Sequence, residues 1–455
     1  MKHSQTLCLT SHVPRPSSLV LRPSSFFPRP SSFFPRPSSF IPRPSTLDPR
    51  PFTLVLLATL LFLFANTLFA QDILQWRGAD RRGMYQETGL LQSWPEGGPE
   101  LLWEFAEAGS GYSSPLITDE RVYVTGEIDT ITYLFALDKS GKVIYKTPVG
   151  KEWTINYPGS RSTPTLVEDL IYLTTGMGTV ACLEAKDGKV RWSLNMQTDF
   201  HAPGITFGYA EGPLVEGNTV FCTPGNADTN VVALDRFTGE IQWISKGLGE
   251  HTAYCSPLLI RLPERNILVT FTAHALLGID TKDGKLLWSN VQDGEGDVHV
   301  NTPWFEDGFI YYITGDGNGS VKLKLSEDGT AITEVWRNKA CDNTMGGFIV
   351  VNNNIYTASY EKRKWYVQDA TTGVNVDSVK FDKGITIFAD NMLYLYNERG
   401  MLGLFKPNGP TMELVSSFKI TRGSKAHYAH PVICNGIMYV RHGNSLLAYD
   451  VRKPK

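Results

Sequence analysis

Short stretches of alternating apolar and polar residues recur between residues 101 and 450, each bounded by turn-forming residues. One motif, called the phrase here, recurs along the chain: an apolar run ends in Asp, a Gly follows three or four residues later, and a second alternating run ends in Trp. Alternation with a period of two predicts half-buried β-strands. The Asp can accept hydrogen bonds from turn amides and the Gly tolerates positive φ, so each phrase predicts a tight hairpin. The phrase is marked by Trp103, Asp138, Trp192, Asp235, Trp243, Asp280, Trp288, Trp336, Asp369 and Asp450.

The repeat has a nearly constant length. Its turn glycines, from Gly141 to Gly409, are separated by 47, 51, 45, 45, 44 and 36 residues. A second hairpin precedes the phrase in most units, as at residues 163–166 and 171–173. Four strands in about 45 residues are typical of one β-propeller blade. The chain contains eight such units, of which those at residues 345–381 and 384–420 are the least regular.

The two ends of the repeat region complement each other. The eighth unit, which ends at Asp450, has three strands, while an orphan strand at residues 101–105 precedes the first complete unit. Pairing the two would complete the eighth sheet and remove an open edge. Solenoids and immunoglobulin-like arrays predict no such orphan, and the Gly-His and Trp-Asp signatures of WD40 blades are missing. We therefore predict an all-β, eight-bladed β-propeller over residues 101–455, with four-stranded antiparallel blades and N- and C-terminal strands sharing one blade.

The first 70 residues have a different character. In residues 1–53, Arg-Pro pairs recur every seven residues in a Ser- and Phe-rich background, which predicts a low-complexity, disordered segment. Residues 54–70 form an apolar run ending in a small Ala70, the layout of a secretory signal peptide. A retained membrane anchor is the alternative, because the run is nearly long enough to span a bilayer. We expect a periplasmic or extracellular protein in which residues 71–100 lead into the ring.

Charge and cysteine content narrow the function classes. Beyond residue 70 the chain carries 36 basic and 45 acidic residues, a formal net charge of −9. Such an acidic domain is poorly suited to phosphate backbones, which argues against nucleic acid as a partner. The five cysteines beyond residue 70 are scattered without a C-x-x-C or adjacent pair, so buried core positions are favoured and any disulfide pairing stays open.

One unit carries the core of a known repeat, Ala-x-Asp-x-x-Thr-Gly-x-x-x-Trp. Its residues are Ala233, Asp235, Thr238, Gly239 and Trp243. Most other units keep part of this core, so residues 101–450 resemble the pyrroloquinoline-quinone-like (PQQ-like) repeat family. Residues 75–78, Gln-Trp-Arg-Gly, likewise resemble the leader of exported bacterial members. The resemblance implies either a quinoprotein dehydrogenase or a non-catalytic propeller, such as the lipoprotein of the outer-membrane β-barrel assembly machine.

Polar and aromatic residues gather in the segments before the first strand of each blade. In a closed ring these segments share one end, so they could form a ligand-binding rim. Alternatively, they cap strand ends and plug a narrow channel, since loops are generally polar. A metal site from three of the histidines has no short-range ligand spacing to support it, and we expect none. The rim candidates are Tyr112, Arg161, His201, Glu211, His251, Tyr254, His299, Asn301, Asn343, His427 and His430.

These observations favour a binding or scaffolding protein of the cell envelope, acting on a protein partner or a small polar ligand without a cofactor. One alternative is a quinone- and calcium-dependent alcohol or sugar dehydrogenase, with PQQ as cofactor and Glu211, Asn301 and Asn343 offering calcium ligands. The chain lacks the adjacent cysteine pair and the long insertions that the resemblance implies for that branch. A second alternative is a carbohydrate-binding or lyase-like propeller that uses the His, Tyr and Arg side chains of the rim.

Overall fold

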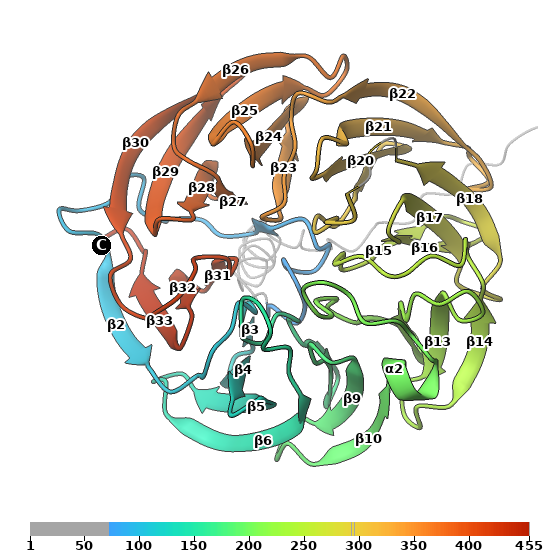
Figure 1. Ribbon diagram of the computed structural model, residues 1–455. Coiled ribbons are helices and arrows are strands. Elements are labelled where there is room, and N and C mark those ends of the chain that lie inside the picture. Colours follow the sequence, from blue (N-terminus) through green and yellow to red (C-terminus); the bar gives the residue numbers. More distant parts are fainter. Residues whose placement is uncertain (1–71, 293, 295, 455) are drawn as a thin grey trace, which may run out of the picture. The chain divides into compact units, whose positions relative to one another are not determined.

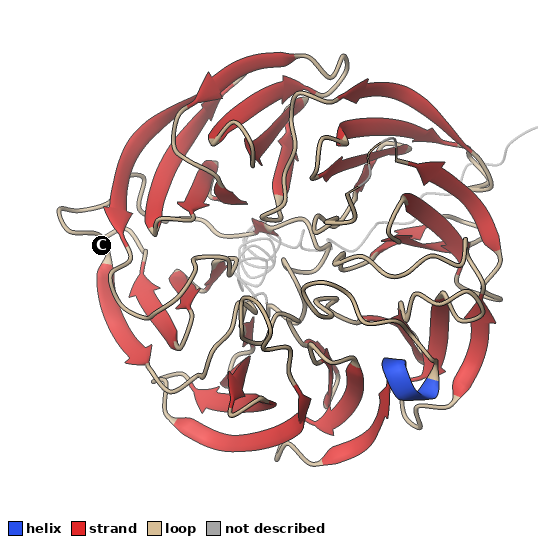
Figure 2. Ribbon diagram, in the orientation of Figure 1, coloured by secondary structure: helices blue, strands red, loops and turns tan. Residues whose placement is uncertain are grey.

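The computed structural model describes residues 72–454 apart from residues 293 and 295. Within this part the regular structure is almost entirely β, and eight sheets surround a central axis (Figures 1 and 2). The segments expected to be of low complexity (1–53) and to act as a signal peptide (54–70) lie outside the described residues. Among the described residues, no helix is long and apolar enough to cross a membrane.

Seven sheets are built on four consecutive antiparallel strands, of which the first lies nearest the axis and the last at the outer rim (Figure 1). The first four sheets are β3 (Leu116–Ile117), β4 (Arg121–Ile128), β5 (Ile131–Asp138) and β6 (Val143–Lys151); β7 (Thr165–Val167), β8 (Leu170–Thr174), β9 (Thr179–Glu184) and β10 (Val190–Asn195); β11 (Leu214–Glu216), β12 (Thr219–Cys222), β13 (Val231–Asp235) and β14 (Ile241–Ser245); and β15 (Leu258–Arg261), β16 (Asn266–Phe271), β17 (Ala275–Asp280) and β18 (Leu286–Val291). The next three are β19 (Trp304–Glu306), β20 (Phe309–Thr314), β21 (Gly319–Leu325) and β22 (Ile332–Asn338); β23 (Phe348–Val351), β24 (Asn354–Ser359), β25 (Lys364–Asp369) and β26 (Asn375–Val379); and β27 (Gly384–Ala389), β28 (Met392–Asn397), β29 (Met401–Asn408) and β30 (Thr411–Lys419).

The eighth sheet joins the two ends of the ring. It contains β31 (Val432–Cys434), β32 (Ile437–His442) and β33 (Ser445–Asp450), and its outer strand is β2 (Glu100–Phe105). Strands β2 and β33 are antiparallel, with Trp103 opposite Ala448. The predicted eight-bladed propeller and its closure are therefore confirmed.

Five of the repeated tryptophans each dock one blade onto the next. The Trp243 indole donates its N–H to the carbonyl oxygen of Thr281 at 2.9 Å, in the hairpin turn of the following blade. Gly284 in that turn has φ +75°, and a Cβ there would lie 2.5 Å from the Trp243 ring, so only glycine fits. The same bond joins Trp103 to Lys139, Trp192 to Arg236, Trp288 to Gly329 and Trp336 to Ala370, and the Tyr145 hydroxyl makes it to Ala185.

The segment that precedes β2, residues 72–99, is called the leader here, and it enters the middle of the ring. Strand β1 (Met84–Tyr85) pairs in parallel with β27 and adds a fifth, innermost strand to that sheet, which the sequence analysis did not predict. The buried Arg77 donates to the carbonyl oxygens of Thr386 and Phe348, in two neighbouring blades. The leader therefore ties inner strands of different blades together.

A second arginine of the leader, Arg81, bonds to the segments that enter two other blades. Arg81 is buried and donates to the carbonyl oxygens of Gly212, Pro213 and Pro257, which precede β11 and β15. Elsewhere in the ring, the short helix α2 (Met196–Asp199) begins at Asn195, whose side chain accepts from the amides of residues 197 and 198. All five cysteines beyond residue 70 are buried, as expected for core positions.

Candidate functional site

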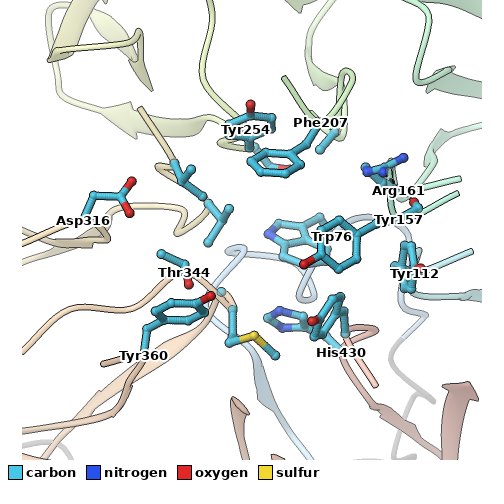
Figure 3. A pocket seen from close by; sticks show the side chains of 17 residues that line it. Trp76, Tyr112, Tyr157, Arg161, Phe207, Tyr254, Asp316, Thr344, Tyr360 and His430 are labelled. Atoms are coloured by element: carbon cyan, nitrogen blue, oxygen red, sulfur yellow. Dashed lines mark hydrogen bonds between the residues drawn. The ribbon is translucent and has the colours of Figure 1, made fainter. Parts of the chain in front are cut away.

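A pocket of about 340 Å³ lies at the axis of the ring (Figure 3). The loops that enter the blades supply most of its walls, because every blade begins at the axis. Two further lining residues, Asp316 and Tyr360, come from turns between the second and third strands of their blades. The lining residues are Trp76, Tyr112, Tyr157, Arg161, Phe207, Ala210, Tyr254, Ser256, Val298, Val300, Asp316, Thr344, Met345, Gly346, Tyr360, Tyr428 and His430.

The leader supplies the floor of this pocket. The Trp76 indole lies in the middle of the lining in Figure 3, and its N–H donates to the Thr302 hydroxyl at 3.1 Å. Its ring packs against that of His430, with 4.4 Å between the centroids. Burial and the nearby Arg77 hold the pKa of His430 well below its usual range. His430 is therefore a neutral imidazole beside an aromatic floor.

A continuous arc of aromatic rings forms one wall. Consecutive ring centroids are 5.6 Å apart for Tyr112 and Tyr428, 6.0 Å for Tyr428 and Tyr157, 6.0 Å for Tyr157 and Phe207, and 5.8 Å for Phe207 and Tyr254. Burial raises the pKa of both Tyr254 and Tyr428 to about 12. The phenols are therefore neutral near pH 7 and offer hydrogen bonds, not a phenolate base.

Arg161 is the one guanidinium in the lining, and its charge is compensated. Its N–H groups donate to the carbonyl oxygens of residues 156, 157 and 159, and Nη1 lies 3.8 Å from the carboxylate of Glu152. The Glu152 carboxylate is buried and accepts from the Thr132 hydroxyl and the Trp153 amide. Arg161 thereby holds the loop carrying Tyr157, whose φ of +44° is unusual for a bulky residue.

Asp316 supplies a carboxylate on the side of the pocket opposite Arg161 in the view of Figure 3. Burial raises the pKa of Asp316, and the carboxylates of Asp297, Asp342 and Glu361 raise it further. Within the described part of the chain, no Lys or Arg forms an ion pair with Asp316. Asp316 is therefore the single carboxyl in the pocket lining, and it has no cationic partner among the described residues.

The structure brings four of the eleven rim candidates into the pocket lining: Tyr112, Arg161, Tyr254 and His430. The other seven lie elsewhere. His201 is exposed, His251 faces Asp297 at 3.9 Å, and His427 stacks on His442 with 3.6 Å between the ring centroids. The buried residues among them point into the protein instead: Glu211 accepts from the Thr223 amide, His299 contacts the Ala273 carbonyl oxygen, and Asn301 donates to the carbonyl oxygen of Asn343.

The sequence analysis did not single out the floor residue Trp76 or the acidic residue Asp316 as site residues. A usable signal for Asp316 exists in the strand order. In a four-stranded antiparallel blade, the turn between the second and third strands lies at the same end as the segment entering the first strand. Turn residues such as Asp316 and Tyr360 therefore belong in any list of rim candidates.

The residues present do not fit calcium and PQQ. Glu211, the carboxylate proposed as a calcium ligand, is buried, accepts a hydrogen bond from the Thr223 amide and is not among the residues that line the pocket. The Asn343 side-chain oxygen already accepts from the Met345 amide. No group of three or more His, Cys, Asp or Glu within the described residues could hold a metal. PQQ is itself a polycarboxylate, whereas the lining offers one guanidinium already paired with Glu152.

Comparison with known proteins identifies the family to which the repeat region belongs. Residues 132–378 match the sequence model of a family described as outer membrane protein assembly factor BamB. The serine/threonine-protein kinase AfsK of Streptomyces griseus is 30% identical over an alignment of 172 residues, which covers 36% of this chain and 20% of that protein. The chain thus spans about a fifth of the length of this curated relative.

Solved structures share the fold at low sequence identity. BamB from Moraxella catarrhalis aligns with a TM-score of 0.55 and 12% identity, covering 78% of this chain and 98% of that one. A europium-containing methanol dehydrogenase aligns with a TM-score of 0.61 and 11% identity, covering 82% and 90%. The quinohemoprotein alcohol dehydrogenase ADHIIG from Pseudomonas putida HK5 gives 0.51 and 11%, covering 85% and 81%. At such identities the likeness establishes the fold alone.

Proposed function

Because the chain belongs to the PQQ-like repeat family, whose sequence model matches residues 132–378, we propose that it is a non-catalytic binding propeller of the cell envelope whose ligand site is the central pocket. The family description as an outer membrane assembly factor supports the envelope setting. The apolar run at residues 54–70 supports export to it.

One observation carries the proposal: the protein's own leader forms the bottom of a preformed pocket that is lined by aromatic rings and few charged groups. A concave, mostly apolar site with a few convergent polar groups is typical of small-ligand binding. The neutral phenols and the neutral His430 suit binding better than proton transfer.

The first experiment asks whether the pocket takes up a ligand at all. N-phenyl-1-naphthylamine, a neutral fluorophore, should brighten on binding to the purified chain. Thr344→Phe should abolish this signal because the new ring fills the pocket. The matched control is Thr330→Phe, which places the same ring in an exposed turn of another hairpin. Equal brightening with the wild type and Thr344→Phe would refute the pocket as the ligand site.

The second experiment separates this function from the dehydrogenase alternative. The purified chain is incubated with PQQ and calcium, passed over a desalting column and assayed for dye reduction with ethanol and with glucose. We expect neither retained quinone absorption nor dye reduction, because the lining offers no free guanidinium and no carboxylate set for calcium. Retained quinone together with dye reduction would establish the enzyme instead.

A further inference from the structure

We propose that the ligand of the central pocket is an organic cation with a fully alkylated ammonium group, held by the aromatic arc and by Asp316. This inference rests on the proposed function and deepens it by naming the class of ligand. Three features of the lining carry it: the aromatic rings, the unpaired carboxyl of Asp316 and an aliphatic stretch of wall.

The aromatic arc presents what a cation needs. An aromatic face carries negative charge density and attracts a cation lying within about 6 Å of the ring centroid. Neighbouring rings along the arc have centroids 5.6 to 6.0 Å apart, so a cation that lies against the arc is close to more than one ring. Trp76, the best ring type for this contact, lies beneath (Figure 3). Two rings are already used by cations of the protein itself: the Lys383 ammonium lies 3.4 Å from the Tyr360 centroid, and the Arg161 guanidinium carbon lies 5.9 Å from that of Tyr112. The ligand is therefore left Tyr428, Tyr157, Phe207 and Tyr254.

The charge of the lining also selects a cation. Arg161 lies 3.8 Å from the carboxylate of the buried Glu152, and Lys383 lies 3.3 Å from Glu398, which also pairs with Arg363. Asp316 has no basic partner among the described residues, and the nearby Asp297 and Asp342 add to the negative field. A bound anion would meet this field without compensation, whereas a cation would relieve it.

An aliphatic stretch of the wall narrows the kind of cation further. A primary ammonium has three N–H donors, each of which must find a partner when it leaves water. The wall that includes Val298, Val300 and Met345 is aliphatic and offers no side-chain oxygen or nitrogen. A quaternary ammonium has no N–H to satisfy, and its methyl groups can pack against such a wall.

The test compares choline with 3,3-dimethylbutan-1-ol, its neutral carbon isostere, by calorimetric titration into the purified chain. Choline should bind about tenfold more tightly than the isostere, since the two differ only in charge. Asp316→Asn should weaken choline about fivefold and leave the isostere unchanged. Asp283→Asn, the matched control, removes the same charge from an exposed hairpin turn and should change neither.

A second variant tests the rings separately from the carboxylate. Tyr157 is 52% exposed, so Tyr157→Leu keeps an apolar side chain at little cost to folding. It should weaken choline binding several-fold and spare the isostere, because only the cation uses the ring face.

The outcomes separate the two proposals. Equal affinities for choline and the isostere, both lost in Thr344→Phe, would overturn the cation while leaving the pocket as a ligand site. Absence of choline binding, with N-phenyl-1-naphthylamine still bound in the pocket, would overturn it likewise. Loss of the fluorophore signal from the wild type would instead refute the proposed function.

Discussion

Arg77 Nη1 donates a hydrogen bond of 2.9 Å to Nδ1 of His430, which joins the leader to a residue 353 positions further along the chain. An arginine can only donate, which fixes Nδ1 as the acceptor and places the imidazole proton on Nε2. The floor of the pocket therefore rests on one buried cation, not two. Arg77 also holds Phe348 and Thr386, so a single side chain supports both the pocket floor and two inner strands.

Arg77→Met should destabilise the protein strongly. Removing the guanidinium leaves several buried carbonyl oxygens without donors, at a cost of about 3 kcal/mol in the free energy of unfolding. Arg261→Met, the control, breaks the ion pair of a side chain that is 63% exposed and should cost less than about 1 kcal/mol. Urea unfolding followed by far-ultraviolet circular dichroism measures both. Similar midpoints for the two variants would mean that the leader does not stabilise the ring.

The docking tryptophans can be tested by separating ring volume from hydrogen bonding. Trp288 is buried and donates to the Gly329 carbonyl oxygen of the next blade at 3.2 Å. Trp288→Phe keeps most of the ring and should cost about 1 kcal/mol, whereas Trp288→Ala should cost roughly 3 to 5 kcal/mol. Val335→Ala on an exposed outer-strand position should change the free energy of unfolding by less than about 0.5 kcal/mol. Equal losses for Phe and Ala would assign the whole effect to the hydrogen bond.

The fold could be predicted because its information is local and repeated. Each hairpin carries its own alternation, turn Asp and turn Gly, and the unpaired strand around Trp103 then had one open sheet to join. The inner strand β1 could not be predicted in this way. Its two residues, Met84 and Tyr85, belong to no repeat and pair with β27 about 300 positions away, so only the assembled ring defines their place.

The site was predictable in location but not in composition. Ring closure places the entry loops at one end, and this brought Tyr112, Tyr254 and His430 into one lining. Whether a given loop residue faces the pocket depends on loop conformation, which no periodicity encodes. His299 and His427 turn into the protein to meet Ala273 and Tyr396, contacts that form only after the blades pack.

Acid should destabilise the protein through its buried histidines. Burial lowers the pKa of His299 to about 4, against 6.5 for an ordinary histidine. Between pH 6.5 and 4, His299 binds a proton in the unfolded chain but stays neutral in the folded protein. The contribution of neutral His299 to the free energy of unfolding is complete above pH 6.5 and is lost as the pH falls through 4. His299→Gln should flatten this part of the pH profile of the melting temperature. The exposed His201→Gln should leave the profile as in the wild type, and an unchanged profile in His299→Gln would show that this ring titrates normally.

Glu211 should give the free energy of unfolding the opposite pH dependence between pH 4.5 and 8, and it therefore opposes the His299 contribution between pH 4.5 and 6.5. Burial raises the pKa of this carboxyl from 4.5 to about 8, and one of its oxygens is buried without a hydrogen-bond partner. Between pH 4.5 and 8 the folded state holds a proton that the unfolded chain releases. Its stabilisation is therefore complete below pH 4.5 and is lost as the pH rises through 8, by an amount on the order of 5 kcal/mol.

Glu211→Gln mimics the protonated carboxyl and should remove this loss, so that the variant gains stability relative to the wild type as the pH rises from 5 to 8. Glu240→Gln, at an exposed turn position, is the matched control and should follow the wild type. Unfolding midpoints in urea at pH 5, 6.5 and 8 give the comparison. Parallel wild-type and Glu211→Gln curves would mean that the carboxylate stays ionised at the centre of the ring, which requires that the neighbouring Arg81 outweighs desolvation.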